Sequence, residues 1–238
     1  MRFQLSNVTQ QWSSRDAWKC VSVYFLLILL GSTLIVLFSW PLLKGWDRQP
    51  VTFLALGCVD IFASLVPTLY FARIRSFAQF KSMFVLDSKP NKAVWQGIVV
   101  MIALQGLSLG LGLFARHLGF RTRGTDVPNL ATASVPELFV FVSLTLVAPF
   151  WEEIMMRGFL YRAFRSSYSK TASSVLIVSL TAITHGPRFI GSIIAAIVLI
   201  AFALVLCWLM ERTGKIWNCI LAHLVFNSIF VLFYFAHR

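Results

Sequence analysis

The chain has 238 residues, of which 58% are hydrophobic and only 13% are charged, with 21 Lys and Arg against nine Asp and Glu. An average soluble domain is about 45–50% apolar and about 25% charged, so this chain has too little charge to cover a water-facing surface. The composition excludes an ordinary soluble enzyme, a disordered chain and a secreted disulfide scaffold. It predicts a polytopic protein whose first partner is the lipid bilayer.

Seven apolar segments are predicted as membrane helices, because about 20 helical residues cross a hydrocarbon core of about 30 Å. Their uninterrupted apolarity excludes strands, since a barrel strand alternates. We therefore expect an all-α transmembrane helix bundle of about seven spans. Its N-terminal part, residues 1–134, holds helices one to three with their loops, and a helical core follows over 135–238. The segments, in chain order, are 20–43, 51–72, 93–115, 138–161, 171–183, 189–210 and 216–236.

The basic residues are scattered over the short loops between these segments. This distribution is typical of the positive-inside rule and does not form the basic face that nucleic-acid binding requires, so no nucleic-acid partner is expected. Thirteen Lys and Arg fall on the side of the N-terminus and seven on the opposite side. The excess predicts a multi-pass protein with a cytoplasmic N-terminus.

Polar side chains at membrane depth are functional candidates, because burying an ionisable group in lipid is costly unless it is paired or faces water. Most of them come after residue 150. The set is Asp60, Glu152, Glu153, Arg157, His185, His223 and the amide Asn227.

The densest group lies in the fourth segment. Glu153 and Arg157 are four residues apart, share a helical face and are expected to form an ion pair. Glu152 points about 100° away from Glu153, so a single arginine need not neutralise both carboxylates. An unpaired carboxylate in a low-dielectric surrounding is suited to act as a general base or acid. Pro149, just upstream, removes an amide donor. The alternative is a buried pair with a purely structural role.

The remaining candidates give weaker evidence of a function when each is considered alone. His223 and Asn227 share a helical face in the last segment, where they could hold a metal, a water or an oxyanion, or join two helices by hydrogen bonds. His185 precedes Gly186 and Pro187 and could equally be an interfacial helix-end residue. Asp60 has no partner at motif spacing, and we interpret it as a structural or lining residue.

The sequence lacks the motifs of two other classes of hydrolase. There is no HExxH motif of the kind found in zinc proteases and no GxSxG serine elbow. The four cysteines, Cys20, Cys58, Cys207 and Cys219, lie in apolar stretches without metal-ligand spacing. We expect them to be buried small hydrophobic residues.

The chemistry-bearing residues resemble a known family. The sequence from Glu152 to Arg157, continued by Gly158-Phe159-Leu160, resembles the EExxxR signature of the CPBP superfamily, which comprises CAAX proteases and bacteriocin-processing or Abi proteins. His185 falls where this family carries its second-motif histidine, and the run 214–227 resembles its last motif. The resemblance covers about residues 135–235. One departure is Thr181, because the family usually has Phe four positions before that histidine.

The resemblance implies a membrane-embedded endopeptidase. Glu152 would be the base that activates a water, with His185 as its partner. His223 and Asn227 would stabilise the oxyanion, and Glu153 and Arg157 would support the site. The substrate would be a peptide or protein: a prenylated CAAX-like protein, another membrane-associated peptide or a leader peptide. No cofactor is required on this interpretation, although a divalent metal such as zinc, held by two histidines and a glutamate, stays open.

Two other hypotheses belong to different classes. The first is a catalytically silent member of the family, in which the same residues form a structural polar core and the protein acts as a scaffold, an immunity protein or a regulatory partner. The second is a transporter or haem protein that uses the buried His and Glu side chains.

Overall fold

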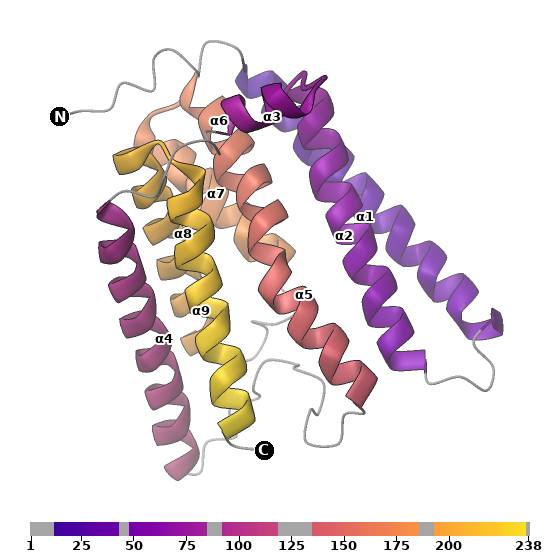
Figure 1. Ribbon diagram of the computed structural model, residues 1–238, viewed down its shortest axis with the longest axis vertical. Helices are drawn as coiled ribbons and strands as arrows, with labels where there is room; N and C mark the ends of the chain where they lie inside the picture. The colour runs from indigo at the N-terminus through magenta and orange to yellow at the C-terminus, as the bar shows by residue number, and fades with distance from the viewer. Residues whose placement is uncertain (1–11, 43–47, 85–91, 119–134, 186–192, 237–238) are drawn as a thin grey trace.

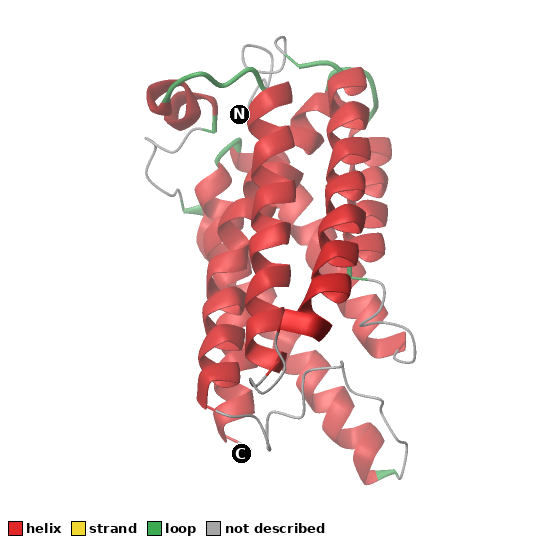
Figure 2. Cartoon of the chain, turned by 90° about the vertical axis from the view of Figure 1, so that its right-hand side faces the viewer, coloured by secondary structure: helices red, strands yellow, loops and turns green. Residues whose placement is uncertain are grey.

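The structure is a computed structural model that describes residues 12–42, 48–84, 92–118, 135–185 and 193–236. Within these ranges every regular element is helical, as the apolar runs predicted (Figures 1 and 2). The elements are α1 (Ser14–Leu42), α2 (Arg48–Phe71), α3 (Phe77–Met83), α4 (Ala93–His117), α5 (Val135–Glu153), the π-helix η3 (Ile154–Tyr161), α6 (Arg162–Arg165), α7 (Lys170–Thr184), α8 (Ile193–Thr213) and α9 (Ile216–Ala236).

Among the described residues, six helical stretches are long and apolar enough to cross a membrane. The fifth predicted segment, 171–183, corresponds to the shorter apolar helix α7. The expected all-α bundle is therefore confirmed, with six full-length spans and one short helix in place of seven spans. The six stretches are Ser14–Phe38, Leu54–Phe71, Ala93–Phe114, Leu138–Arg165, Ile193–Thr213 and Ile216–Phe233.

Helix α5 lies at the centre of the arrangement (Figure 1). It packs against α2 on one side and α9 on the other, while α1 packs mainly on α2, and α4 packs on α8 and α9. Helices α2 and α9 are thus direct neighbours of α5, whereas α7 packs on α8 and on the π-helix η3 (Ile154–Tyr161) that continues α5. The pair formed by α1 and α2 closes one flank of this group.

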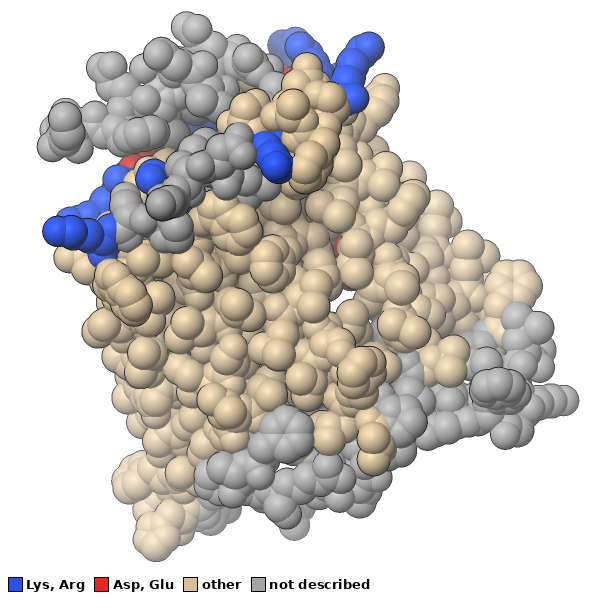
Figure 3. Space-filling view, in the orientation of Figure 1, with Lys and Arg blue, Asp and Glu red and all other residues tan. Residues whose placement is uncertain are grey.

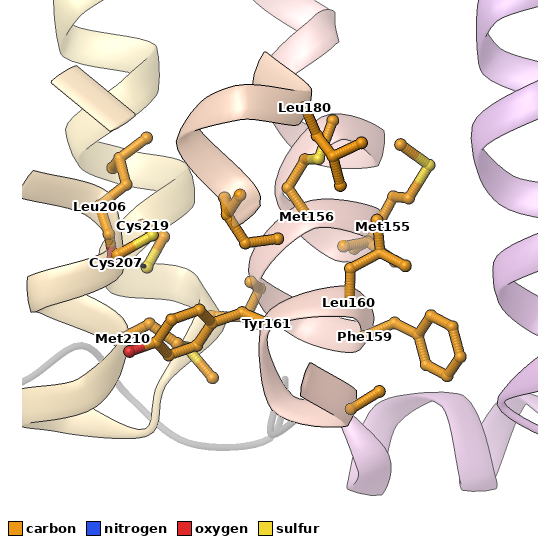
Figure 4. Packing of buried hydrophobic residues seen from close by; sticks show 14 of the residues in the cluster. Met155, Met156, Phe159, Leu160, Tyr161, Leu180, Leu206, Cys207, Met210 and Cys219 are labelled. Carbon is orange, nitrogen blue, oxygen red and sulfur yellow. Dashed lines mark hydrogen bonds between the residues drawn. The ribbon is translucent and has the colours of Figure 1, made fainter. Parts of the chain in front are cut away.

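Helices α5, η3 and α6 follow one another without a break. The change from α to π hydrogen bonding falls at Ile154, directly after the two glutamates, whereas Pro149 lies inside α5. Short π-helical stretches are rare and occur frequently at functional sites. All eight residues of η3 are buried, and Figure 4 shows several of them packing against side chains of α7, α8 and α9.

The π-helix also packs closely on the segment that follows α3. A Cβ atom added to Gly158 would lie 2.7 Å from the Cδ1 atom of Phe84. Phe84 is fully buried and lies against the ring of Trp12. The glycine in the first motif is therefore a packing requirement, because only a residue without a side chain fits beneath this ring.

Charged side chains gather at one end of the bundle, where α1 and α9 begin and α2 ends (Figures 1 and 3). The sides of the molecule show almost only uncharged residues on the face drawn in Figure 3. This uncharged girdle suits a multi-pass membrane protein. The exposed basic residues of this end are Arg15, Lys19, Arg73, Arg75, Lys81, Lys92, Lys170 and Arg212.

Candidate active site

A buried network joins α5, η3 and α9. The Nη1 atom of Arg157 donates to Oε1 of Glu153 at 2.9 Å, and Nδ1 of His223 lies 2.9 Å from the same oxygen. The side chains of these three residues are 2%, 0% and 6% exposed. The ion pair predicted from the four-residue spacing is present, and it includes the histidine of the last motif.

Helix packing explains why the histidine reaches this pair. The first turns of α9 lie against η3, and the ring of His223 is held edge-on by Phe202 of α8, with ring centroids 4.7 Å apart. Arg157 also reaches α8, where its Nη2 atom lies 3.4 Å from the carbonyl oxygen of Ala203. Among the described residues, Oε2 of Glu153 is buried and has no hydrogen-bond partner, so the bonds that anchor this carboxylate there go to Oε1.

Glu152 occupies a different environment from its neighbour. Its side chain is 24% exposed, and its Oε2 atom lies 3.9 Å from Nε2 of His223. The two adjacent carboxylates therefore flank the two nitrogens of one imidazole. Glu153 is buried and fixed, whereas Glu152 is partly open and beyond direct hydrogen-bond distance. Figure 3 shows acidic atoms in a recess in the middle of the uncharged face.

His185 lies at the carboxyl end of α7. Its Nδ1 atom is 3.0 Å from the carbonyl oxygen of Thr181 and 3.0 Å from Oγ1 of Thr184. Thr181, the departure from the family pattern, is itself buried, and its hydroxyl donates to the carbonyl of Ile177. The ring is thus fixed by its own helix end through Nδ1.

Asn227 has a structural partner that the sequence reasoning did not identify. Its Nδ2 atom donates to the carbonyl oxygen of Thr145 at 2.8 Å. Thr145 is four residues before Pro149, which has no N–H to bond that carbonyl within the helix. The asparagine of α9 therefore satisfies the backbone acceptor that the proline of α5 leaves open.

Asp60 of α2 also belongs to this region, although its sequence position gave no motif partner. Its Oδ1 atom accepts a hydrogen bond from Tyr24 Oη at 3.2 Å, and its Oδ2 atom accepts from Trp151 Nε1 at 3.0 Å. It lies within range of charge interaction with Glu152 and His185. An isolated carboxylate at membrane depth was the only signal in the sequence that could have identified it.

The four cysteines lie in two kinds of surroundings. Cys20, Cys207 and Cys219 are buried, as expected, but Cys58 is exposed on α2, so the prediction is wrong for that residue. Figure 4 shows Cys207 and Cys219 close to one another. Within the described ranges, no group of three or more His, Cys, Asp or Glu side chains is arranged to hold a metal ion.

Comparison with known protein families gives a match in the C-terminal part of the chain, which carries most of the candidate residues. Residues 134–229 match the family described as Type II CAAX prenyl endopeptidase Rce1-like. This part of the chain is therefore similar to the Rce1-like family. The match confirms the resemblance inferred from the motifs, and it contains all six candidate residues from Glu152 to Asn227. This similarity and the six long apolar helices support an integral multi-pass membrane protein, and the similarity supports intramembrane protease activity in general terms.

One curated relative is similar over a longer stretch than the Rce1-like segment. The UPF0177 protein YbdI of Lactococcus lactis subsp. lactis (strain IL1403) is 25% identical over 142 residues, which cover 56% of this chain and 70% of the relative. No solved structure gives a significant match.

Proposed function

We propose that this Rce1-like protein is an intramembrane endopeptidase that hydrolyses a peptide bond of a membrane-associated substrate through a water activated by Glu152. The observation that supports the proposal best is the arrangement around His223. One glutamate is buried and anchored by Arg157, and the other is partly open and close to the second nitrogen of the same ring. A structural ion pair needs only the first glutamate.

Glu152 is the proposed base. Its Oε2 atom and Nε2 of His223 are 3.9 Å apart, so one water molecule can lie at an ordinary hydrogen-bond distance of about 2.8 Å from both atoms. Glu152 would take a proton from this water as it attacks the substrate carbonyl. His185, fixed through Nδ1, would use Nε2 to assist proton transfer on the opposite side of the water.

His223 is the proposed oxyanion donor, and its contacts set a condition on that role. Because the ionised carboxylate of Glu153 can only accept, Nδ1 of His223 must carry a proton. Nε2 then donates to an oxyanion only when the ring is protonated on both nitrogens. Arg157 holds Glu153, and Glu153 in turn lies against Nδ1, so Nε2 is the nitrogen on the side of Glu152.

Asn227 is the proposed second donor. A side-chain amide has two N–H groups. One of them bonds the carbonyl of Thr145 and so fixes the orientation of the amide, which leaves the second N–H to stabilise the oxyanion. Preorganised donors of this kind each contribute about 10²–10³-fold to the rate in hydrolases.

We propose that the substrate approaches from the charged end of the bundle, which the positive-inside rule places in the cytoplasm together with the N-terminus. His223 is seven residues after the first residue of α9, which corresponds to about 10 Å below that end at 1.5 Å per residue. A peptide that lies at the membrane surface can reach this depth. CAAX-like prenylated peptides and leader peptides are the two substrate classes to compare.

The decisive experiment measures cleavage of fluorogenic peptides by the purified full-length protein in proteoliposomes. Wild type, Glu152→Gln and Glu211→Gln are compared, and Glu211 serves as the matched control because it is a paired glutamate outside the site. The panel contains a farnesylated CAAX-type peptide, its unprenylated counterpart and a leader-type peptide. We expect Glu152→Gln to lose cleavage by at least about 100-fold, while Glu211→Gln retains it. Parallel assays after dialysis against a chelator, with metal analysis, test for a metal requirement.

Full activity in Glu152→Gln would refute the proposed mechanism. If wild-type protein cleaves none of the peptides, and Glu152→Gln leaves the phenotype of the host cell unchanged while changes to surface loops abolish it, the silent-member hypothesis replaces the protease. Loss of cleavage together with a lower melting temperature would indicate misfolding, which size-exclusion chromatography and thermal unfolding of each variant detect.

A further inference from the structure

Asp60 connects the N-terminal helices to the candidate site. It lies in the middle of α2, outside the Rce1-like match at residues 134–229. Its two carboxylate oxygens are bonded to different helices, one to Tyr24 of α1 and the other to Trp151 of α5. Both bonding partners are themselves buried, at 6% and 5% exposure. The carboxylate therefore joins three helices at one point.

The bond to α5 ends on the residue directly before the proposed base. Trp151 is bulky and buried, so a hydrogen bond on its indole nitrogen fixes both the side chain and the backbone that carries Glu152. Glu152 is partly exposed and has no close anchor comparable to the bond that holds Glu153. A base in this position needs support from its neighbour, because small displacements of a reacting group cost large factors in rate.

A carboxylate at position 60 is a costly choice for a simple link. An asparagine or glutamine could satisfy a tyrosine or tryptophan donor without charge, and a charged group in a membrane helix needs compensation. Asp60 also lies within range of charge interaction with Glu152 and His185, and this place beside the proposed base favours a role linked to the site.

We infer that Asp60 is a positioning residue that holds Trp151, and through it Glu152, in the geometry needed for catalysis. The expected effect of Asp60 on the reaction rate rests on the proposed function. The structural role of Asp60 rests on its two hydrogen bonds, to Tyr24 and to Trp151. It also gives helices α1 and α2 a specific contribution to a site whose other residues all lie after position 134.

The kinetic test uses the full-length protein in proteoliposomes and four variants: Asp60→Ala, Asp60→Asn, Trp151→Phe and the double variant Asp60→Ala/Trp151→Phe. The control is Thr68→Val, which changes another buried polar contact between α1 and α2, the one between Thr68 and Cys20. We expect Asp60→Ala to lower kcat by about 100-fold with KM within about threefold. Asp60→Asn keeps a hydrogen-bond acceptor and should therefore lower kcat less than Asp60→Ala does. Thr68→Val should retain the wild-type kcat.

The double variant tests the route through the tryptophan. If Asp60 acts through Trp151, the double variant should be no slower than the slower single variant. Multiplicative losses would overturn the inference, because Asp60 would then act on the reaction independently. Activity of Asp60→Ala within twofold of wild type would overturn it as well.

A spectroscopic test keeps this inference separate from the protease proposal. The protein is labelled with 5-fluorotryptophan, and the ¹⁹F resonance of Trp151 is assigned by its loss in Trp151→Phe. We expect Asp60→Ala, which removes the acceptor of the indole N–H, to shift this resonance, and Thr68→Val to leave it in place. A shift without any peptidase activity in wild type would support the positioning role while refuting the proposed reaction. An unshifted resonance in Asp60→Ala would overturn the positioning role whatever the activity.

Discussion

Two Glu–Arg pairs lie at different depths along the continuous stretch of helix formed by α5, η3 and α6. Glu153 and Arg157 lie in the interior with side chains that are 0% and 2% exposed, and they share an oxygen with His223. Arg165 and Glu211 lie at the charged end with side chains that are 24% and 15% exposed, and Tyr161 donates to the same glutamate. The chemistry is alike, but only the second pair retains access to water.

The difference shows how burial changes the effect of an ion pair on the stability of the fold. At the charged end, either partner can be solvated when the other is lost, so the pair stabilises the fold only slightly. In the interior, each charge depends on the other, and loss of one leaves an uncompensated charge. The interior pair also has a second acidic neighbour and a histidine, which a structural pair does not need. We therefore treat the end pair as structural and the interior pair as part of a site.

The largest expected effect comes from removing the carboxylate at the centre of the network. Glu153→Ala leaves Arg157 and His223 without their shared acceptor, and we expect a loss of about 3–5 kcal/mol in the free energy of unfolding. Equilibrium unfolding in mixed micelles, followed by tryptophan fluorescence, measures this loss, with Glu211→Ala as the matched variant. Equal destabilisation by the two changes would remove the distinction between the pairs.

The second effect concerns activity more than stability. His223→Gln removes the ring that both glutamates face, and we expect cleavage of a reporter peptide to fall by about 10²–10³-fold, the usual effect of losing an oxyanion donor. Because Glu153 keeps its bond to Arg157, this variant should unfold at higher denaturant concentration than Glu153→Ala. The opposite order of stability would show that the histidine, and not the arginine, is the main support of the buried carboxylate.

A third, intermediate effect is expected where the π-helix meets Phe84. Gly158→Ala places a methyl group 2.7 Å from the Phe84 ring, and overpacking of this kind costs about 1–3 kcal/mol. The compensating variant Gly158→Ala/Phe84→Leu should recover part of the stability, as measured by the thermal midpoint in detergent. A double variant less stable than Gly158→Ala alone would show that the ring has another role than covering this glycine.

The smallest effect is expected at the charged end. Arg165→Gln breaks the pair with Glu211 in a half-buried, water-accessible position, and we expect a loss of less than about 1 kcal/mol. Raising the salt concentration should shrink the difference between this variant and wild type, because screening weakens exposed pairs. A salt-insensitive loss above 2 kcal/mol would place this pair in the same class as the interior one.

Some features of the site could be predicted from local spacing. Glu153 and Arg157 form the expected ion pair because a four-residue separation brings two side chains together on any helix. The different surroundings of Glu152 and Glu153 follow from the rotation of about 100° between successive helical residues. Motif order could also indicate that His223 belongs with these residues, but not which glutamate its nitrogens would face.

Other features depend on contacts between helices and gave no local signal. Asn227 bonds the carbonyl of Thr145, 82 residues away, because Pro149 leaves that acceptor open. Asp60 bonds Trp151 across 91 residues, and neither residue has a spacing that marks the other. Thr181 was identified as a departure from the family pattern, but only the structure shows its carbonyl at the ring of His185.

The sequence by itself determined the membrane class, the helical segments and the set of candidate residues, because hydrophobic runs and helical spacing are properties of short stretches of chain. The tertiary structure decided which oxygen faces which nitrogen, that a π-helix follows the two glutamates, and that α2 contributes a carboxylate beside them. These features depend on how each helix is rotated and placed against its neighbours, and that placement is set by packing over the whole bundle.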